Sequence, residues 1–340
     1  MSARRSILPV FIPHLGCPHA CVFCNQHAIT AGPKAASDPL HELNRLLNLP
    51  PDGSERELAF YGGSFTALPE AEQLRFLEPA AKALSEGRIS AVRLSTRPDA
   101  VDPETLYRLK KYGVTTVELG AQSMRDEVLL LSGRGHTAQD VRDAALPVRG
   151  FGFSLVLQMM TGLPGDDDEG AAYTARELIA LRPDAVRIYP TVVVRGTRLQ
   201  QMWQAGEYRE HTVEDAVRVC ARILPLFEDA GIPVIRLGLN PTEELGFGPG
   251  SAAPAGAALA GAYHPALGEL VRSRILRNRM EARLSAMGCA GKDILFTVPP
   301  RLLSQAVGQH RENVTWLTEH FGLASLRITG SDDPNDPNLI

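Results

Sequence analysis

The sequence predicts an α/β protein built as a partial or nearly closed parallel (β/α) barrel with a small C-terminal α/β appendage. Short β-branched or apolar runs alternate with amphipathic helical stretches from residue 7 to about residue 240. Alternation of this length indicates a parallel sheet with helical crossovers. The chemically informative residues lie just after the C-terminal ends of the expected strands, where barrel enzymes carry their sites, and this favours a barrel.

The expected strands are short runs suited to burial on both faces of a parallel sheet. They span 7–12, 57–63, 91–96, 115–120, 154–160, 185–190 and 233–238. The expected helices span 38–48, 69–85, 102–112, 137–149, 168–181 and 211–230. Asp38 before Pro39 and Asp102 before Pro103 predict helix starts, because a carboxylate there accepts from free backbone N–H groups.

Composition shifts along the chain predict its domain organisation. We expect the barrel to occupy residues 1–240. Residues 241–262 are rich in Gly, Ala and Pro, which predicts a flexible linker or a lid. Residues 263–330 form the expected helical and α/β appendage, and residues 331–340 read as a disordered tail.

Bulk composition is that of an ordinary globular cytoplasmic protein. The chain has 340 residues, of which 44% are hydrophobic and 22% charged, and its net charge is −4. That charge gives no global attraction to nucleic acid or membranes, and no apolar run is long enough to span a bilayer. Three of the five cysteines fall within eight residues. This spacing predicts a metal site in a reducing compartment, not a disulfide framework.

The segment GCPHACVFCN places Cys17, Cys21 and Cys24 in a C-x3-C-x2-C pattern after the first expected strand. Thiolates are the usual ligands of iron–sulfur clusters, and a four-iron cluster normally takes four. Supplying three leaves one iron open for a substrate or cofactor. The alternative is zinc, held by the three thiolates together with His14 or His19.

Gly62, Gly63 and Ser64 follow Tyr61 at the end of the second expected strand. Glycines at such a position let the backbone approach a ligand closely, because no Cβ stands in the way. The alternative is a turn that simply ends the strand.

The cysteine pattern, with Phe23 immediately before its last cysteine, resembles the signature of radical S-adenosylmethionine (SAM) enzymes. The resemblance implies a radical SAM barrel and a [4Fe–4S] cluster whose open iron chelates the amino and carboxylate groups of SAM. It also implies that Phe23 lies near the adenine and that Gly62, Gly63 and Ser64 meet the SAM amino group. A one-electron reductant would then drive SAM cleavage, and the 5′-deoxyadenosyl radical would abstract hydrogen from a substrate.

A closer resemblance is to the radical SAM barrel of the Elongator catalytic subunit, a family that modifies wobble uridines in transfer RNA. The matching stretches are GGSFTALPE (62–70), STRPD (95–99), VELGAQS (117–123), RGHT (134–137), MMTGLPG (159–165) and RIYPTVVVRGTRL (187–199). The resemblance implies SAM contacts at Gln122, Arg134 and Gln158. Gln122 and Arg134 also match SAM-holding positions of the coproporphyrinogen-type enzymes. Taken alone, the amides read as core residues and the arginine as a solvated cation.

Two departures limit this resemblance. Ser95 stands where the family often has Glu, and a serine cannot hold the ribose hydroxyls bidentately as a carboxylate can. The roughly 100 residues after the barrel contain no recognisable acetyl-CoA loop, so acetyl-CoA-dependent chemistry is not expected. Tyr189, at the end of the sixth expected strand, is a candidate for positioning substrate or donating hydrogen. Its alternative is a packing tyrosine at the barrel rim.

The appendage weakly resembles a KH module, in which a GXXG loop between two helices clamps single-stranded nucleic acid. Here the loop reads Gly308-Gln309-His310-Arg311, so the second glycine is replaced. Residues 263–311 carry a local charge of +5, which suits a phosphate-facing surface for RNA. The basic residues are Arg272, Arg274, Arg277, Arg279, Arg283, Lys292, Arg301 and Arg311. The alternative is a solvated basic helix face.

Three functions follow as hypotheses. The first is a radical SAM enzyme that acts on RNA, specifically a tRNA base. The second is a radical SAM enzyme that acts on a small molecule or peptide. The third is a zinc-stabilised binding protein without catalysis.

Overall fold

The protein is described by a computed structural model, which divides into two compact units. The described residues are 5–12, 15–25, 38–239, 256–333, 336 and 338–340. The first unit comprises residues 1–212 and 226–263, and the second comprises residues 213–225 and 264–340. The boundary therefore passes through one helix, α9 (Val213–Asp229), which the sequence assigned to the barrel.

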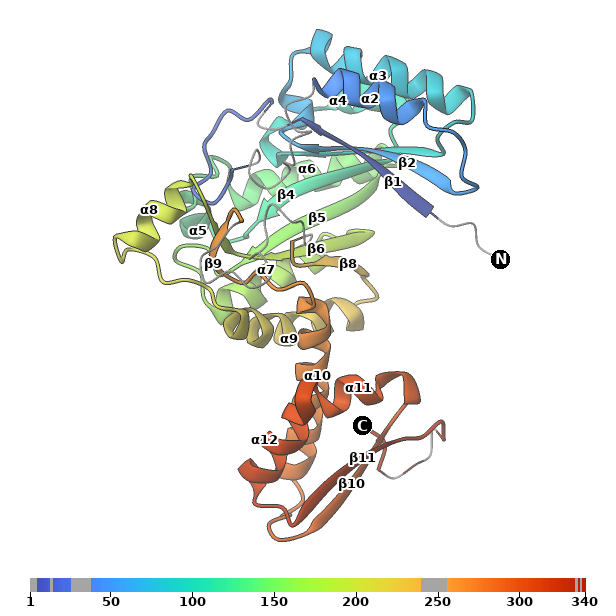
Figure 1. Cartoon of the computed structure of the whole chain (residues 1–340). Coiled ribbons are helices and arrows are strands. Elements are labelled where there is room, and N and C mark those ends of the chain that lie inside the picture. The colour runs from blue at the N-terminus through green and yellow to red at the C-terminus, as the bar shows by residue number, and fades with distance from the viewer. Residues whose placement is uncertain (1–4, 13–14, 26–37, 240–255, 334–335, 337) are drawn as a thin grey trace. The chain divides into compact units, whose positions relative to one another are not determined.

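Seven parallel strands form the sheet of the first unit, which curls into a half-barrel (Figure 1). In sheet order they are β1 (Arg5–Ile12), β2 (Glu55–Gly62), β3 (Ala91–Thr96), β4 (Thr116–Gln122), β5 (Ser154–Thr161), β6 (Ala185–Pro190) and β8 (Val234–Leu237). Strands β1 and β8 are the two edges. The predicted class, a partial parallel barrel, is confirmed.

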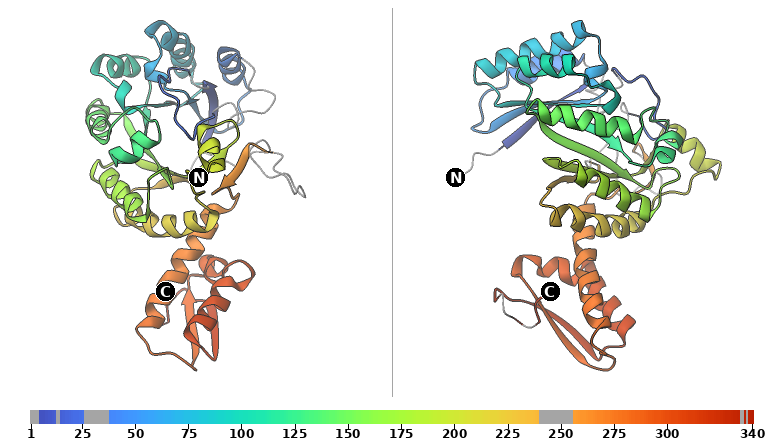
Figure 2. Two further views of the ribbon diagram at one scale, coloured as in Figure 1. Left: turned by 90° about the vertical axis from the view of Figure 1, so that its left-hand side faces the viewer. Right: turned by 180° about the vertical axis from the view of Figure 1, so that it is seen from behind.

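Helices between the strands cover the outer face of the curled sheet (Figure 2). They are α2 (Pro39–Leu47), α3 (Glu70–Ser85), α4 (Pro103–Lys111), α6 (Ala138–Gly150) and α7 (Asp168–Ala180), joined by the shorter α5 (Asp126–Leu131) and α8 (Arg198–Gln204). In the part of the chain that the structure describes, no helix is long and apolar enough to cross a membrane.

Local sequence signals explain where these helices begin and how they pack. The Asp38 carboxylate accepts from the backbone N–H of Leu40 at 3.1 Å, and that of Asp102 accepts from Thr105 at 2.8 Å. Both predicted caps are therefore confirmed. Between sheet and helices, the buried rings of Phe60 and Phe76 lie with centroids 5.7 Å apart, so aromatic packing fixes α3 against β2.

A two-stranded antiparallel sheet lies beside the barrel. Its strands are β7 (Val192–Val194) and β9 (Ala258–Gly261). The linker or lid expected at 241–262 falls mainly on residues 240–255, which lie outside the described residues. The C-terminal end of that segment is a paired strand.

The second unit contains the expected small α/β appendage. Its elements are α10 (Leu267–Ser285), β10 (Asp293–Val298), α11 (Leu303–Val307), α12 (Glu312–Phe321) and β11 (Ser325–Gly330). Strands β10 and β11 pair in parallel, from Asp293 opposite Ser325 to Val298 opposite Gly330. The order strand, helix, loop, helix, strand is the one on which the KH-like interpretation rests.

The last residues of the chain depart from the expected disordered tail. The Thr297 N–H donates to the carbonyl of Asn338 at 2.9 Å, and the Ile340 N–H donates to the Thr297 carbonyl at 3.0 Å. Leu339 thereby forms a parallel bridge with Thr297, and Ile340 packs on the core of the unit. Backbone pairing with the edge of β10 accounts for this order.

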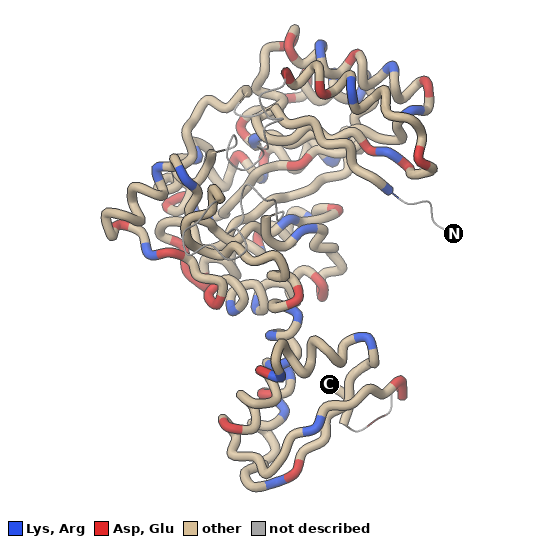
Figure 3. Tube along the Cα trace, in the orientation of Figure 1, with Lys and Arg blue, Asp and Glu red and all other residues tan. Residues whose placement is uncertain are grey.

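The expected phosphate-facing surface also needs correction. Arg274 and Arg277 are only 9% exposed. Arg274 Nη2 lies 2.8 Å from Glu214 Oε1, and Arg277 Nη1 lies 3.7 Å from Glu312 Oε1. Figure 3 shows basic and acidic positions interspersed in this unit. These two guanidinium groups are therefore buried against glutamates of neighbouring helices and are not exposed as the expected surface requires.

Candidate functional site

The cysteine loop lies at the C-terminal edge of the sheet, immediately after β1. The Gly63 N–H donates to the Ile12 carbonyl at 3.0 Å, and the Ser64 N–H donates to the Leu15 carbonyl at 2.8 Å. A Cβ on Gly63 would overlap both carbonyl oxygens. Gly63 therefore seats the cysteine loop against the end of β2, whatever else it contacts.

The loop is also held from two other sides. The Val22 N–H donates to the Ser132 carbonyl at 3.0 Å, and the Val22 carbonyl accepts from the Leu199 N–H at 2.7 Å. Phe23 and Trp203 both pack against a buried cluster that includes residues of β7, α8 and β9. The segment after β6 thus covers the cysteine loop, and Phe23 is placed by apolar packing.

Cys17, Cys21 and Cys24 are all half-buried. Within the described ranges, no three His, Cys, Asp or Glu side chains are gathered closely enough to hold a single metal ion. His14, one of the two histidines of the zinc alternative, lies outside the described residues.

Two arginines surround the thiols. Arg134 Nη1 donates to Cys21 Sγ at 3.4 Å. Burial, followed by the neighbouring Cys21, raises the pKa of the Cys17 thiol, while Arg97 and Arg134 oppose this rise. Without a metal, burial therefore favours the neutral thiol of Cys17, while Arg97 and Arg134 supply the positive charge that would stabilise thiolate ligands of an iron–sulfur cluster.

The end of β4 is irregular where Gln122 stands. The pairing with β5 shifts register between Gly120 and Gln122, and Gln122 takes a φ of 67°, in the left-handed region. Arg134 Nη2 donates to the Gly120 carbonyl at 2.6 Å, and His136 Nε2 lies 3.2 Å from the Ala121 carbonyl. Burial and Arg134 lower the pKa of His136 to about 4, so its ring is neutral and donates this bond.

Several buried polar atoms of this region have no hydrogen-bond partner among the described residues, and they include Gln122 Oε1 and Arg134 Nε. Buried polar groups are normally paired, so these atoms suit a ligand that supplies both a donor and an acceptor. SAM, with an ammonium and a carboxylate on one carbon, is such a ligand.

Other predicted SAM contacts are engaged within the protein. The Ser64 hydroxyl is fully buried, lies 3.0 Å from the Thr96 hydroxyl and accepts from the Arg97 N–H at 3.2 Å. Ser95 Oγ donates to the Phe60 carbonyl at 3.3 Å. The structure thus shows their side chains bonding β2 to β3 at the edge where the other residues meet.

An ion network that was not predicted from the sequence lies on the inner face of the sheet. At its centre, Glu118 is fully buried. Its carboxylate accepts from Arg93 Nη1 at 3.0 Å, Arg187 Nη2 at 3.1 Å, Tyr61 Oη at 3.2 Å and Gln158 Nε2 at 3.0 Å. Gln158, a predicted SAM contact, therefore has its amide N–H on Glu118.

Tyr189 joins this network from β6. Arg187 Nη1 donates to its hydroxyl at a long 3.5 Å. Burial raises the pKa of Tyr189, so the phenol stays protonated. The signal that could have found the network was present: Arg93, Glu118 and Arg187 are charged residues inside otherwise apolar strands.

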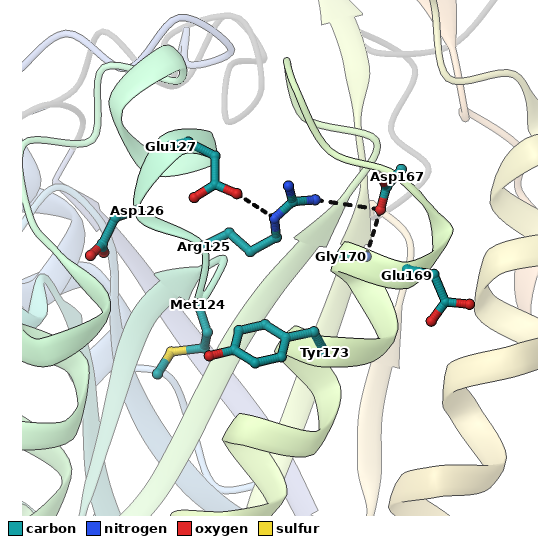
Figure 4. Close-up of a pocket in the computed structure, with 8 residues that line it drawn as sticks. All are labelled: Met124, Arg125, Asp126, Glu127, Asp167, Glu169, Gly170 and Tyr173. Carbon is teal, nitrogen blue, oxygen red and sulfur yellow. Dashed lines mark hydrogen bonds and ion pairs between the residues drawn. The ribbon is translucent and has the colours of Figure 1, made fainter.

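An open cleft of about 510 Å³ lies at the loops after β4 and β5 (Figure 4). Its lining residues are Met124, Arg125, Asp126, Glu127, Asp167, Glu169, Gly170 and Tyr173. Arg125 Nε lies 2.6 Å from Glu127 Oε1 and its Nη1 lies 3.4 Å from Asp167 Oδ1, so the arginine is neutralised within the cleft. The cleft contains none of the predicted site residues and is distinct from the cysteine-loop region.

Comparison with known proteins agrees with this geometry. The family model of the radical SAM superfamily matches residues 11–178, and that of the radical SAM C-terminal domain matches residues 183–277. Elongator complex protein 3 of Homo sapiens is 32% identical over 218 residues, which cover 57% of this chain and 40% of that protein. The tRNA uridine(34) acetyltransferase of Methanocaldococcus jannaschii is 32% identical over 164 residues, 47% of this chain and 29% of that protein.

Among solved structures, the archaeal Methanocaldococcus infernus Elp3 with an N-terminal deletion matches with a TM-score of 0.60 at 24% identity. The match covers 83% of this chain and 64% of that one, and it shows the shared fold. The matches to the human and Methanocaldococcus jannaschii relatives each cover less than half of the length of the relative. The chain has a three-cysteine loop on a curled parallel sheet, and the two family models match consecutive parts of it. It therefore belongs to the radical SAM superfamily and is a radical SAM enzyme that uses a [4Fe–4S] cluster and SAM.

Proposed function

We propose that Cys17, Cys21 and Cys24 hold the [4Fe–4S] cluster and that SAM binds beside them at the ends of β2 and β4. The observation that carries this proposal is the hydrogen bond from Arg134 to Cys21, because it brings the β4 edge into contact with the cysteine loop. When bound, the cluster and SAM would supply, with one electron from a reductant, the radical chemistry that abstracts hydrogen from a substrate.

The SAM contacts in this proposal follow from position. The unpaired atoms of Gln122 and Arg134 would hold the amino-acid end of SAM. Gly62 and Gly63 present backbone at the same edge, with Ser64 behind them. Three further contacts complete the proposal. Phe23 would lie near the adenine of SAM, Ser95 near its ribose, and Gln158 would contact SAM from the inner face of the sheet.

We propose an RNA substrate, specifically a tRNA base. The relatives support this, since one is named a tRNA uridine(34) acetyltransferase. The exposed loop of Gln309, His310 and Arg311 between α11 and α12 supports RNA contact by the second unit. Arg272 and Arg279 remain exposed on α10 for phosphates. Acetyl transfer is not part of the proposal.

Tyr189 is proposed to face the substrate and to position it or donate hydrogen. Its phenol is half-buried on the inner face and stays protonated. A one-electron reductant completes the proposed reaction. A cytoplasmic location belongs to the same proposal, because clustered thiols persist in a reducing compartment.

The test is reductive SAM cleavage by protein that has been purified anaerobically and reconstituted with iron and sulfide. Under dithionite, we expect 5′-deoxyadenosine from the wild type and none from Cys24→Ala. Cys289→Ala is a matched control, since Cys289 is a buried cysteine of the second unit, and it should retain activity. Stoichiometric zinc without iron or cleavage would support the non-enzymatic alternative instead.

The substrate class is tested by adding bulk tRNA to the same reaction. Modified nucleosides in digested tRNA, formed only with SAM and reductant, would support the RNA proposal. Abortive SAM cleavage that tRNA leaves unchanged, together with no binding of tRNA, would favour a small molecule or peptide substrate.

A further inference from the structure

Arg97 lies directly after β3, next to the site but outside the set of predicted contacts. It is only 4% exposed. Its Nε and Nη2 each donate to one carboxylate oxygen of Asp99 at 2.9 Å, and its Nη2 also donates to the backbone carbonyl of Arg134 at 2.5 Å. The guanidinium is therefore fixed on one side and holds a loop on the other.

The loop that Arg97 holds joins the cysteine loop to the end of β4. Its Ser132 carbonyl accepts from the Val22 N–H of the cysteine loop. Its Arg134 side chain bonds Cys21 Sγ and the Gly120 carbonyl, and its His136 ring bonds the Ala121 carbonyl. The positions of two successive carbonyls at the end of β4, those of Gly120 and Ala121, thus depend on where this loop lies.

The backbone at that end is unfavourable without support. Gln122 takes a left-handed φ of 67°, which a side-chain-bearing residue adopts only where its surroundings impose it. The two carbonyls before it are those that Arg134 and His136 hold. If the loop shifted, the strand end would relax and the Gln122 amide would turn away from the site.

We propose that Arg97, braced by Asp99, is a positioning residue for the SAM-binding geometry of Arg134 and Gln122. This inference rests on the proposed function. In it Arg97 does not touch SAM: its role is to fix the loop of residues 132–136, which in turn fixes the irregular end of β4. Groups that orient a site residue commonly matter as much as the residue itself.

The test compares Arg97→Gln with Arg56→Gln. Arg56 is a matched control, because it is also buried, at 9% exposed, and it donates to the backbone carbonyls of Leu49 and Pro50, before β2 at the opposite end of the sheet. The dissociation constant of SAM is measured on cluster-loaded protein from the SAM-induced change in the electron paramagnetic resonance spectrum. Iron content and thermal unfolding are measured in parallel.

We expect Arg97→Gln to weaken SAM binding by at least about tenfold. Arg56→Gln should lower the unfolding temperature comparably but leave SAM affinity unchanged. Arg97→Lys should recover part of the affinity. Equal SAM affinity of Arg97→Gln and wild type would overturn the inference and leave the proposed function standing. If the Arg97 variants do not fold, the SAM affinity of Asp99→Asn is measured instead. This change weakens the ion pair with Arg97 at a partly exposed carboxylate, and an unchanged affinity would likewise overturn the inference.

A second readout is independent of the cluster. Hydrogen–deuterium exchange of the metal-free protein should become faster in residues 120–123 and 132–136 in Arg97→Gln, and unchanged there in Arg56→Gln. Unchanged exchange in those segments would contradict the proposed positioning role. If the wild type itself failed to bind iron or SAM, the proposed function would fail, and this measurement would still decide whether Arg97 holds the loop.

Discussion

Arg187 Nη2 donates a hydrogen bond to the Tyr61 hydroxyl at 2.9 Å, although the two residues stand on strands β6 and β2 with three strands between them. In a flat sheet, four inter-strand steps would separate their backbones by roughly 19 Å. The contact therefore shows that the sheet is strongly curled, because the curl brings the side chains of β2 and β6 together. It also shows that the inner face closes on a polar network centred on Glu118.

Replacing Glu118 by Gln should destabilise the protein by about 3 kcal/mol, because it leaves the guanidinium groups of Arg93 and Arg187 without their shared buried carboxylate. The free energy of unfolding in urea measures this. Glu72→Gln is the matched control: its exposed pair with Arg75 should be worth less than about 1 kcal/mol. Equal effects of the two changes would show that the network contributes no special stability.

Adding one methyl group at Gly120 should impair SAM binding more than folding. A Cβ there would come within 2.9 Å of Gln122 Nε2 and 3.2 Å of Arg134 Nη2, so both side-chain ends must move. Because flexible ends yield readily, we expect Gly120→Ala to lose less than about 2 kcal/mol of stability while the KM for SAM rises several-fold. Gly150→Ala, with open space at its Cβ, should change neither. An unchanged KM for SAM in Gly120→Ala would contradict the proposed contacts.

Asp166 should make stability depend on pH. Burial raises the pKa of Asp166 from 3.8 to about 6, so the folded protein favours the neutral carboxyl. The stabilisation is therefore complete below about pH 4 and is lost as pH rises through about 6. Relative to Asp166→Asn, the wild type should lose at most about 3 kcal/mol over this range. Unfolding free energies of both proteins at several pH values check this, and a constant difference between them would refute it.

Arginines of α10 should separate into two kinds. Exposed Arg279 is expected to contribute to RNA binding, so Arg279→Gln should weaken tRNA binding and reduce the slope of log K against log salt by about 1. Buried Arg274 pairs with Glu214, so Arg274→Gln should cost about 1 kcal/mol of stability and leave that slope unchanged. Binding isotherms at several salt concentrations distinguish the two, and identical slopes for wild type and Arg279→Gln would exclude RNA contact there.

Much of the architecture follows from local sequence. The alternation of strand-like and helix-like segments predicted the seven parallel strands, because the apolar spacing that distinguishes a strand from a helix is visible within a few neighbouring residues. The caps at Asp38 and Asp102 were predictable for the same reason. The cysteine spacing, read with Phe23 and the glycines at the end of β2, pointed to the correct superfamily, because each of these two motifs consists of residues that lie close together in the chain.

Tertiary structure alone decided which distant side chains meet. Strand period assigns Tyr61, Glu118 and Arg187 to faces, but only the curl of the sheet brings those faces within hydrogen-bond distance. Likewise, charge counts placed Arg274 among phosphate-facing residues, whereas packing buried it against Glu214. Arg97 gained its importance from a carbonyl 37 residues away. Local sequence patterns determine which segments become helices and strands. The free energy of burying a charged side chain, by contrast, depends on partners that only the folded chain brings close.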